Sequence, residues 1–151
     1  MRAYRIGDPS GSFPVYCGKG AALVEGRWHA LGQEVIYASE HYSPAMLEKL
    51  VQTNGILPPT QHFVEIEIPA GVSYEVVTKD TVENWSSFDG KSARAYGSRW
   101  LTEVRSALPI VPSCVAREET NVLVNPRHSH AHRIRCGLEK PVWWDDWLFG
   151  R

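Results

Sequence analysis

The chain has 151 residues, of which 43% are hydrophobic, and its formal net charge is −1. This length and composition predict one domain, residues 1–151, with a core of its own. The net charge gives no general attraction to nucleic acid, and no apolar run approaches the roughly 20 residues of a membrane span. The N-terminal segment MRAYRIGDPS lacks the apolar stretch of a cleaved signal. We therefore expect a cytoplasmic protein that contacts neither a membrane nor, directly, nucleic acid.

The three cysteines, Cys17, Cys114 and Cys136, are odd in number, lie far apart and form no CxxC motif. This pattern predicts reduced thiols rather than a disulfide framework or a zinc site. We expect all three to be small buried hydrophobic residues.

Strand patterns come first along the chain. A candidate strand at residues 2–6 is followed by a stronger one at residues 34–39. Because successive side chains of a strand point to opposite faces, Val35 and Tyr37 are predicted to share one face and Ile36 to lie on the other.

The segment HYSPAMLEKLVQTNG, residues 41–55, carries the signals of a helix. Ser43 is predicted to cap its N-terminus, and Pro44 suits the first helical position. Asn54 and Gly55 form a stop signal. The helix is therefore expected to begin just after Ser43 and to end before Asn54.

The second half of the chain is predicted from its alternating and helical patterns. In the segment HFVEIEIP, Val64, Ile66 and Ile68 are expected to face the core. Short strands with irregularly inserted helices predict an α+β fold rather than regular βαβ winding. We expect strands at 62–69, 74–77, 109–116, 120–125 and 133–138, a helix at 92–107, and a short helical turn opened by Asn125-Pro126.

The segment NPRHSHAHRIR, residues 125–135, concentrates histidine and arginine. On a strand, His128, His130 and His132 would share one face, which suggests a metal site because neutral imidazole is a common ligand. The segment contains no acidic residue and opens with a turn signal, so a solvated basic segment is favoured. A nucleic-acid patch made by its arginines is not favoured either, because no aromatic residues are interleaved to stack bases.

Three other residues form a more informative set. Arg27 follows Gly26, which lets the backbone come close to a ligand, and a guanidinium pairs with two phosphate oxygens at once. Tyr37 lies inside an apolar strand, and Glu48 lies on the first helix, away from its apolar stripe. Each also has a simpler interpretation. Arg27 could stack on Trp28 at the surface, Tyr37 could be a core residue, and Glu48 could be merely solvated.

The order of the short motifs GRW, YAS, AMLE, VPS and NPRH resembles the RES-domain family. Members of this family are toxins of bacterial toxin–antitoxin pairs, named for Arg, Glu and Ser residues. The resemblance covers nearly the whole chain. It implies an α+β fold like that of diphtheria-toxin-type ADP-ribosyltransferases, with a split, twisted sheet surrounded by helices. It also implies NAD as the substrate and an R-Y-E site where related enzymes carry H-Y-E.

Carried over to this chain, the resemblance makes Arg27, Tyr37, Glu48 and Ser113 the expected catalytic residues. These four, together with Asn121, are expected to bind NAD without a metal. Arg27 would hold the pyrophosphate, and Tyr37 would lie against nicotinamide or ribose. Glu48 would stabilise the positive charge that develops on the ribose, and Ser113 would add a polar contact inside the pocket.

The activity implied by the resemblance is cleavage of NAD at the nicotinamide–ribose bond, with water or phosphate as the acceptor. ADP-ribosylation of a protein and, more distantly, a non-catalytic RNA- or protein-binding module remain open. The implied partner is an antitoxin with a helix-turn-helix domain of the Xre type. The aromatic residues near the C-terminus either contribute to that interface or pack on the core: Trp143, Trp144, Trp147 and Phe149.

Overall fold

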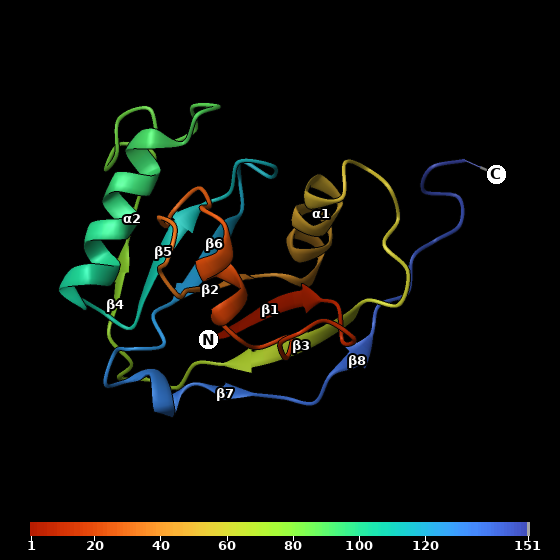
Figure 1. The fold of residues 1–151 in the computed structure, drawn as a ribbon, viewed down its shortest axis with the longest axis horizontal. Coiled ribbons are helices and arrows are strands. Elements are labelled where there is room, and N and C mark those ends of the chain that lie inside the picture. The colour runs from red at the N-terminus through yellow and green to blue at the C-terminus, as the bar shows by residue number, and fades with distance from the viewer. Residues whose placement is uncertain (151) are drawn as a thin grey trace.

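A curled sheet and two helices form the body of the molecule (Figure 1). The computed structural model describes residues 1–150. The helices are α1 (Tyr42–Gln52) and α2 (Lys91–Glu103), with short 3-10 helices at η1 (Lys19–Leu23) and η2 (Ala131–Arg133). The strands are β1 (Arg2–Gly7), β2 (Ile36–Ser39), β3 (His62–Glu67), β4 (Tyr74–Val76), β5 (Leu108–Pro112), β6 (Thr120–Val124), β7 (Arg135–Cys136) and β8 (Lys140–Pro141).

The sheet consists of two halves that meet at β1 and β2. Its strand order is β4-β5-β6-β2-β1-β3-β7, and β8 also pairs with β3. All pairs are antiparallel except β4 with β5. The halves are joined through one residue pair, Tyr4 with Ser39. This arrangement confirms the predicted α+β fold with a split sheet.

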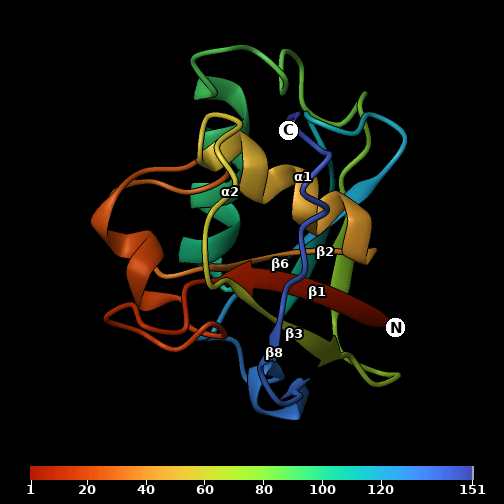
Figure 2. The ribbon, with the colours of Figure 1, turned by 90° about the vertical axis from the view of Figure 1, so that its right-hand side faces the viewer.

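Each half of the sheet carries one helix. Helix α2 buries Trp100 and Leu101 in an apolar cluster that also contains Val111 of β5 and Leu123 of β6. Helix α1 lies against β1 and β2, and its Ala45 packs in a separate cluster. Figure 2 shows α1 above β1, with the C-terminal segment running past it. The space between the two helices therefore lies over the junction of the two half-sheets.

The predicted alternation of β2 is confirmed by the clusters in which its residues lie. Val35, the residue just before β2, and Tyr37 belong to the cluster beneath α2. Ile36 belongs to a different cluster, which also contains Val64 and Ile66 of β3. Both faces of this strand are apolar because each is covered, which is typical of a strand in the middle of a sheet.

The predicted start of α1 is wrong by about two residues. The helix begins at Tyr42, and the N-cap is His41, whose side chain makes no capping hydrogen bond. Pro44 is tolerated at the third helical position because the first N–H groups of a helix have no partner inside it. The stop signal is confirmed: Asn54 and Gly55 both have positive φ, and Gly55 N donates to Leu50 O at 2.8 Å.

Helix α2 ends four residues earlier than predicted. It stops at Glu103, and Val104 adopts a left-handed conformation with φ 50°, which is unusual for a β-branched residue. The reversal places Ser106 where its Oγ accepts a hydrogen bond from Trp100 Nε1 at 2.9 Å. It also places Arg105 against Glu75 of β4, with two hydrogen bonds of 3.1 and 2.7 Å. These tertiary contacts end the helix at Glu103, although the spacing of apolar residues had predicted that it would continue to residue 107.

The expectation of three buried cysteines is wrong. All three thiols are free, but Cys17 and Cys114 are half-buried and Cys136 is exposed. The three free thiols agree with the prediction of reduced cysteines, whereas the prediction that all three are buried in the core is wrong.

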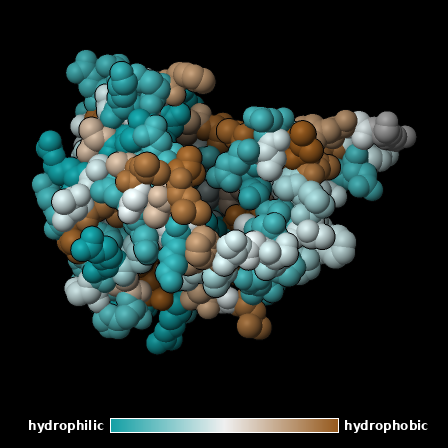
Figure 3. Space-filling model, in the orientation of Figure 1, coloured by the Kyte–Doolittle hydropathy of each residue, from teal (hydrophilic) through white to brown (hydrophobic). Residues whose placement is uncertain are grey.

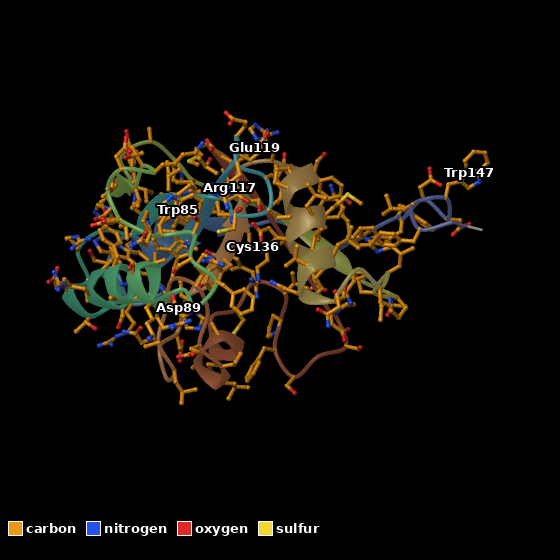
Figure 4. All side chains as sticks on the ribbon, turned by 90° about the horizontal axis from the view of Figure 1, so that it is seen from above. Trp85, Asp89, Arg117, Glu119, Cys136 and Trp147 are labelled. Carbon is orange, nitrogen blue, oxygen red and sulfur yellow. The ribbon has the colours of Figure 1, made fainter. Side chains whose placement is uncertain are left out.

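Of the aromatic residues near the C-terminus, one packs on the core. Trp144 packs beside Ile6 and Val142, whereas Trp143 is 83% and Trp147 69% exposed. Figure 4 shows Trp147 far out on the projecting C-terminal segment. Packing on the core therefore accounts for Trp144, and an interface role for the other three stays a prediction. Within residues 1–150, no helix has both the length and the apolar character of a bilayer span.

Candidate active site

A cleft of about 700 Å³ opens where the two half-sheets meet. Figure 3 shows the hollow between the side of the molecule that carries α2 and the side that carries α1. Of the five residues predicted from the sequence, four line this cleft: Arg27, Tyr37, Glu48 and Asn121. They come from the loop before β2, from β2, from α1 and from β6. The fifth, Ser113, is not among the lining residues.

Glu48 is held in place through one of its carboxylate oxygens. Its Oε1 accepts hydrogen bonds from Ser113 Oγ at 2.9 Å and from Asn121 Nδ2 at 2.8 Å. Asn121 is oriented in turn by Ser39, whose Oγ donates to Asn121 Oδ1 at 2.9 Å. The other carboxylate oxygen, Oε2, has no hydrogen-bond partner among residues 1–150. The carboxylate is therefore fixed in position and still has one oxygen available to a ligand.

Ser113 lies behind Glu48 rather than in the pocket. Its side chain has no exposed surface, and its Oγ accepts a hydrogen bond from Ala116 N at 3.1 Å while donating to Glu48. In the structure Ser113 contacts the carboxylate of Glu48, and its polar contact with a bound ligand stays a prediction. Ser113 acts on the site by orienting Glu48.

The face that α1 turns toward the cleft is mainly polar. Glu48, Lys49 and Gln52 line the cleft together with the apolar Val51. Leu47 is 43% and Val51 57% exposed. The helical wheel correctly separates Glu48 from the apolar stripe, but part of that stripe faces solvent. Glu48 is therefore not a merely solvated helix residue.

Tyr37 lines the cleft, and its hydroxyl group is held by the two residues that follow Arg27. The hydroxyl oxygen accepts a hydrogen bond from Trp28 N at 3.1 Å and lies 2.7 Å from His29 Nδ1. Burial raises the pKa of Tyr37, and the Trp28 N–H and the nearby arginines offset only part of this rise. The tyrosine is therefore neutral throughout the physiological range.

Gly26 is needed for a close approach within the protein. A Cβ atom there would lie 2.6 Å from His29 Cε1 and 2.8 Å from the Tyr37 hydroxyl oxygen, distances that real Cβ atoms do not adopt. The sequence had suggested that this glycine lets the backbone approach a ligand. The structure shows that it also lets the backbone pack over His29 and Tyr37, and Gly26 lines the cleft.

Arg27 is tied to a loop on the α2 side of the cleft. Its Nη1 donates to the carbonyl oxygens of Trp85 at 3.2 Å and Ser87 at 2.9 Å. Trp28 is 3% exposed and packs edge-on against Tyr96. A surface stack of Arg27 on Trp28 is therefore wrong. Figure 4 shows the arginine that does lie over a tryptophan near this loop, Arg117 beside Trp85, with 5.3 Å from the guanidinium carbon to the ring centroid.

Arg5 and Lys49 are two positively charged residues of the cleft that were not predicted from the sequence. Arg5 donates from Nε to Val15 O at 2.6 Å and from Nη1 to Tyr37 O at 2.8 Å. Burial lowers the pKa of both side chains, and the charge of Arg5 further lowers that of Lys49. The signal available in the sequence was an arginine in the middle of a strand, a position where a charge needs a specific partner.

The histidines of residues 125–135 make separate contacts within the protein. His128 Nδ1 accepts from His130 N at 2.9 Å, and His130 Nδ1 accepts from Ser73 N at 3.0 Å. His132 Nδ1 lies 2.5 Å from Ser129 O. Within residues 1–150, no group of three His, Cys, Asp or Glu side chains is placed to hold a metal ion. The predicted helical turn at Asn125 is a tight turn instead, in which Asn125 Oδ1 accepts from Arg127 N at 3.0 Å.

The contacts of His128 predict how the stability of the fold depends on pH. Partial burial, and then the charge of His130, lower the pKa of His128 below its usual range. The unfolded chain therefore binds this proton more readily than the folded chain. Stability from His128 is complete above the usual histidine pKa of about 6.5 and is lost as the pH falls below it. Thermal unfolding measured between pH 7.5 and 5 should show a shallower decline for His128→Asn, and an unchanged slope would contradict this.

Comparisons with known proteins relate this site to a family. The model of the RES domain matches residues 2–145. The chain is 37% identical over 140 residues to the Prs ADP-ribosylating toxin of a Sphingobium species, a match covering 89% of this chain and 83% of the relative. It is 34% identical over 125 residues to the toxin Res of Pseudomonas putida, covering 81% of this chain and 85% of that relative.

A solved structure shares the fold. The chain superposes on a chain of the M. tuberculosis MbcT–MbcA toxin–antitoxin complex with a TM-score of 0.75 and 14% sequence identity, covering 94% of this chain and 84% of the other. The family model spans almost the whole chain, and both relatives exceed 30% identity over most of their length. This protein therefore belongs to the RES domain family.

Proposed function

We propose that this chain is the toxin of a bacterial toxin–antitoxin pair and that it cleaves NAD at the nicotinamide–ribose bond. The observation that carries the proposal is how the carboxylate group of Glu48 is hydrogen-bonded. Ser113 and Asn121 fix one of its carboxylate oxygens, and the other has no partner among residues 1–150. The name of the Sphingobium relative supports the substrate, because the ADP-ribosyl group that such a toxin transfers is a part of NAD.

The chemistry of the bond explains why a fixed carboxylate is useful. When the bond between the ribose anomeric carbon and nicotinamide breaks, its electron pair stays with the nicotinamide nitrogen, which becomes neutral. The ribose becomes oxocarbenium-like and positively charged. A carboxylate held beside it stabilises this transition state more than the ground state. Addition of water to the anomeric carbon, with loss of a proton, completes hydrolysis to ADP-ribose.

The positive charges of the cleft suit the pyrophosphate of NAD. Arg5, Arg27 and Lys49 all line it, and a guanidinium can hold two phosphate oxygens at once. Arg27 Nη1 is already engaged with the carbonyl oxygens of Trp85 and Ser87, which holds the head of the side chain in one place. We assign the pyrophosphate to Arg27.

Arg27→Ala is expected to weaken NAD binding by about tenfold or more, because a charge-assisted hydrogen bond is worth roughly 1.5–3 kcal/mol. Arg27→Lys should restore little of the lost NAD affinity, since an ammonium group lacks the two parallel N–H donors of a guanidinium group. Affinity is best measured by calorimetry in a Glu48→Gln background, so that NAD is not consumed. Arg99→Ala, on an exposed position of α2, is the control for lost positive charge. Equal affinities for Arg27→Ala and the control would contradict the assignment.

The direct test of the proposed function is to mix the purified chain with NAD and identify the products by mass. Nicotinamide is expected with either ADP-ribose or, when phosphate is added, a phosphorylated ADP-ribose. Release should continue after thorough chelation of metals. Release that stops on chelation and returns with zinc would contradict the metal-free reaction, and unchanged NAD would contradict the proposal itself.

The alternative acceptor is a protein side chain, an outcome supported by the word ADP-ribosylating in the name of the Sphingobium relative. Labelled NAD incubated with a bacterial lysate and the chain would then leave label on a protein. A non-catalytic RNA-binding module is the more distant alternative. It predicts binding that weakens steeply with salt. His128 and His130 instead bond within the protein.

The proposed partner is an antitoxin with an Xre-type helix-turn-helix domain. The solved structure that shares this fold is a toxin–antitoxin complex. A cleft bordered by Arg27 attracts a carboxylate or a chain terminus, and the exposed Trp143 and Trp147 offer aromatic surface of the kind found at interface centres.

Expression of this chain alone is expected to arrest growth and lower cellular NAD, because an unrestrained NAD-cleaving enzyme harms its own cell. Co-expression with the antitoxin should restore both. The Glu48→Gln variant, expressed alone, separates the effect of catalysis from that of overproduction. Growth and NAD levels unaffected by the unaltered chain would count against the toxin assignment.

A further inference from the structure

His29 is a buried titratable residue next to the site to which the reaction above gives no role. Its side chain is 3% exposed, and its ring contacts Tyr37 edge-on, with 5.5 Å between the ring centroids. The backbone of Gly26 covers the ring closely enough that a Cβ atom would clash with it. His29 is therefore confined between Gly26, Tyr37 and the segment that contains η1.

The hydrogen bonds of His29 define which ring nitrogen carries the proton. Nε2 lies 2.7 Å from Ala21 O and 2.9 Å from Val24 O. A carbonyl oxygen only accepts hydrogen bonds, so Nε2 must carry a hydrogen. In the neutral ring Nδ1 is then an acceptor, and the hydroxyl group 2.7 Å away, that of Tyr37, must donate to it.

Both hydrogen-bonding functions of the Tyr37 hydroxyl are consequently used within the protein. Its hydrogen goes to His29 Nδ1, and its oxygen accepts from Trp28 N at 3.1 Å. The hydroxyl has no hydrogen left to donate to a ligand. Tyr37 still lines the cleft, so the part of it offered to a ligand is the aromatic ring, at an angle set by His29 and Trp28.

We infer that His29 is a positioning residue for Tyr37: it accepts the hydroxyl hydrogen and thereby fixes the ring against which nicotinamide or ribose lies during bond cleavage. This inference rests on the proposed NAD cleavage. It assigns Tyr37 a stacking role and excludes it as a proton donor to the leaving group.

A matched pair of substitutions separates the two nitrogens of His29. Asparagine places an acceptor oxygen near the position of Nδ1, whereas glutamine places its amide near the position of Nε2. His29→Gln keeps the contact with Ala21 and Val24 but removes the acceptor for Tyr37. We expect its kcat to fall about tenfold with a smaller change in KM, as for one lost neutral hydrogen bond. His29→Asn should retain several-fold more turnover than His29→Gln.

A double-mutant cycle distinguishes positioning of Tyr37 from a general effect on the fold. In a Tyr37→Phe background the hydroxyl is absent, so His29→Gln and His29→Asn should turn over NAD at similar rates. A loss for His29→Gln that persists at full size in the Tyr37→Phe background would overturn the inference. So would a His29→Gln variant as active as the parent.

A second measurement is independent of NAD turnover. Nitrogen-15 NMR of the imidazole should show the hydrogen of His29 on Nε2, and the Nδ1 resonance should move in Tyr37→Phe, where its donor is lost. A hydrogen on Nδ1, or an unmoved resonance, would overturn the inference even if NAD is cleaved. If the unaltered protein cleaves no NAD but the NMR result is as expected, the proposed function fails and the hydrogen-bond assignment stands.

Discussion

Glu48→Gln is expected to bind NAD with an affinity close to that of the parent and to lose about 100- to 1,000-fold in turnover, the range seen when one electrostatic contact to a transition state is removed. The geometry makes this substitution a clean one. The amide oxygen of glutamine can accept the hydrogen bonds that Ser113 and Asn121 now donate to Oε1. Only the charge and the oxygen without a partner are changed.

The experiment needs single-turnover rates of nicotinamide release together with NAD affinity by calorimetry. Glu67→Gln, which removes a carboxylate from an exposed position of β3, is the matched control and should behave as the parent. Parental turnover in Glu48→Gln would refute charge stabilisation by this residue. A loss of affinity as large as the loss of turnover would show that Glu48 acts in ground-state binding instead.

Gly97→Ala is expected to destabilise the fold by about 3 kcal/mol or more, although alanine is the better helix former by about 1 kcal/mol. Gly97 lies in α2, and a Cβ atom there would be 1.8 Å from the carbonyl oxygen of Trp28. That neighbour is backbone, so it cannot rotate away. Either α2 or the segment carrying Arg27 and Trp28 must move.

Thermal unfolding measures this directly, because roughly 3 kcal/mol corresponds to a fall in Tm of about 6–12 °C for a chain of this size. Ser98→Ala, at the next position of the same helix, is the control and should change Tm little. A Tm for Gly97→Ala equal to or above that of the parent would show that the contact between α2 and Trp28 is looser than in the structure. Since Arg27 adjoins Trp28, NAD affinity should fall together with Tm.

Local sequence patterns were sufficient to predict several helices and strands. The alternation of β2 was predicted because each of its faces packs against an apolar partner, Tyr37 in one cluster and Ile36 in another. The end of α1 was predicted because Asn54 and Gly55 adopt positive φ, which few other residues do without strain. The early end of α2 at Val104 was not predictable, since it depends on the contacts that Arg105 and Ser106 make with distant residues.

The candidate site divides in the same way. The sequence by itself indicated the family, through the order of its short motifs. The family in turn indicated Arg27, Tyr37, Glu48 and Asn121 as site residues, and the structure brings these four to one cleft. Only the tertiary structure showed that Ser113 is buried behind Glu48, that His29 holds Tyr37, and that Arg5 and Lys49 add charge. The physical reason is that the spacing of apolar residues along the chain indicates on which face of a helix or strand a side chain lies. Hydrogen-bond partners and burial depend instead on how β1, β2, β6 and α1 come together in space.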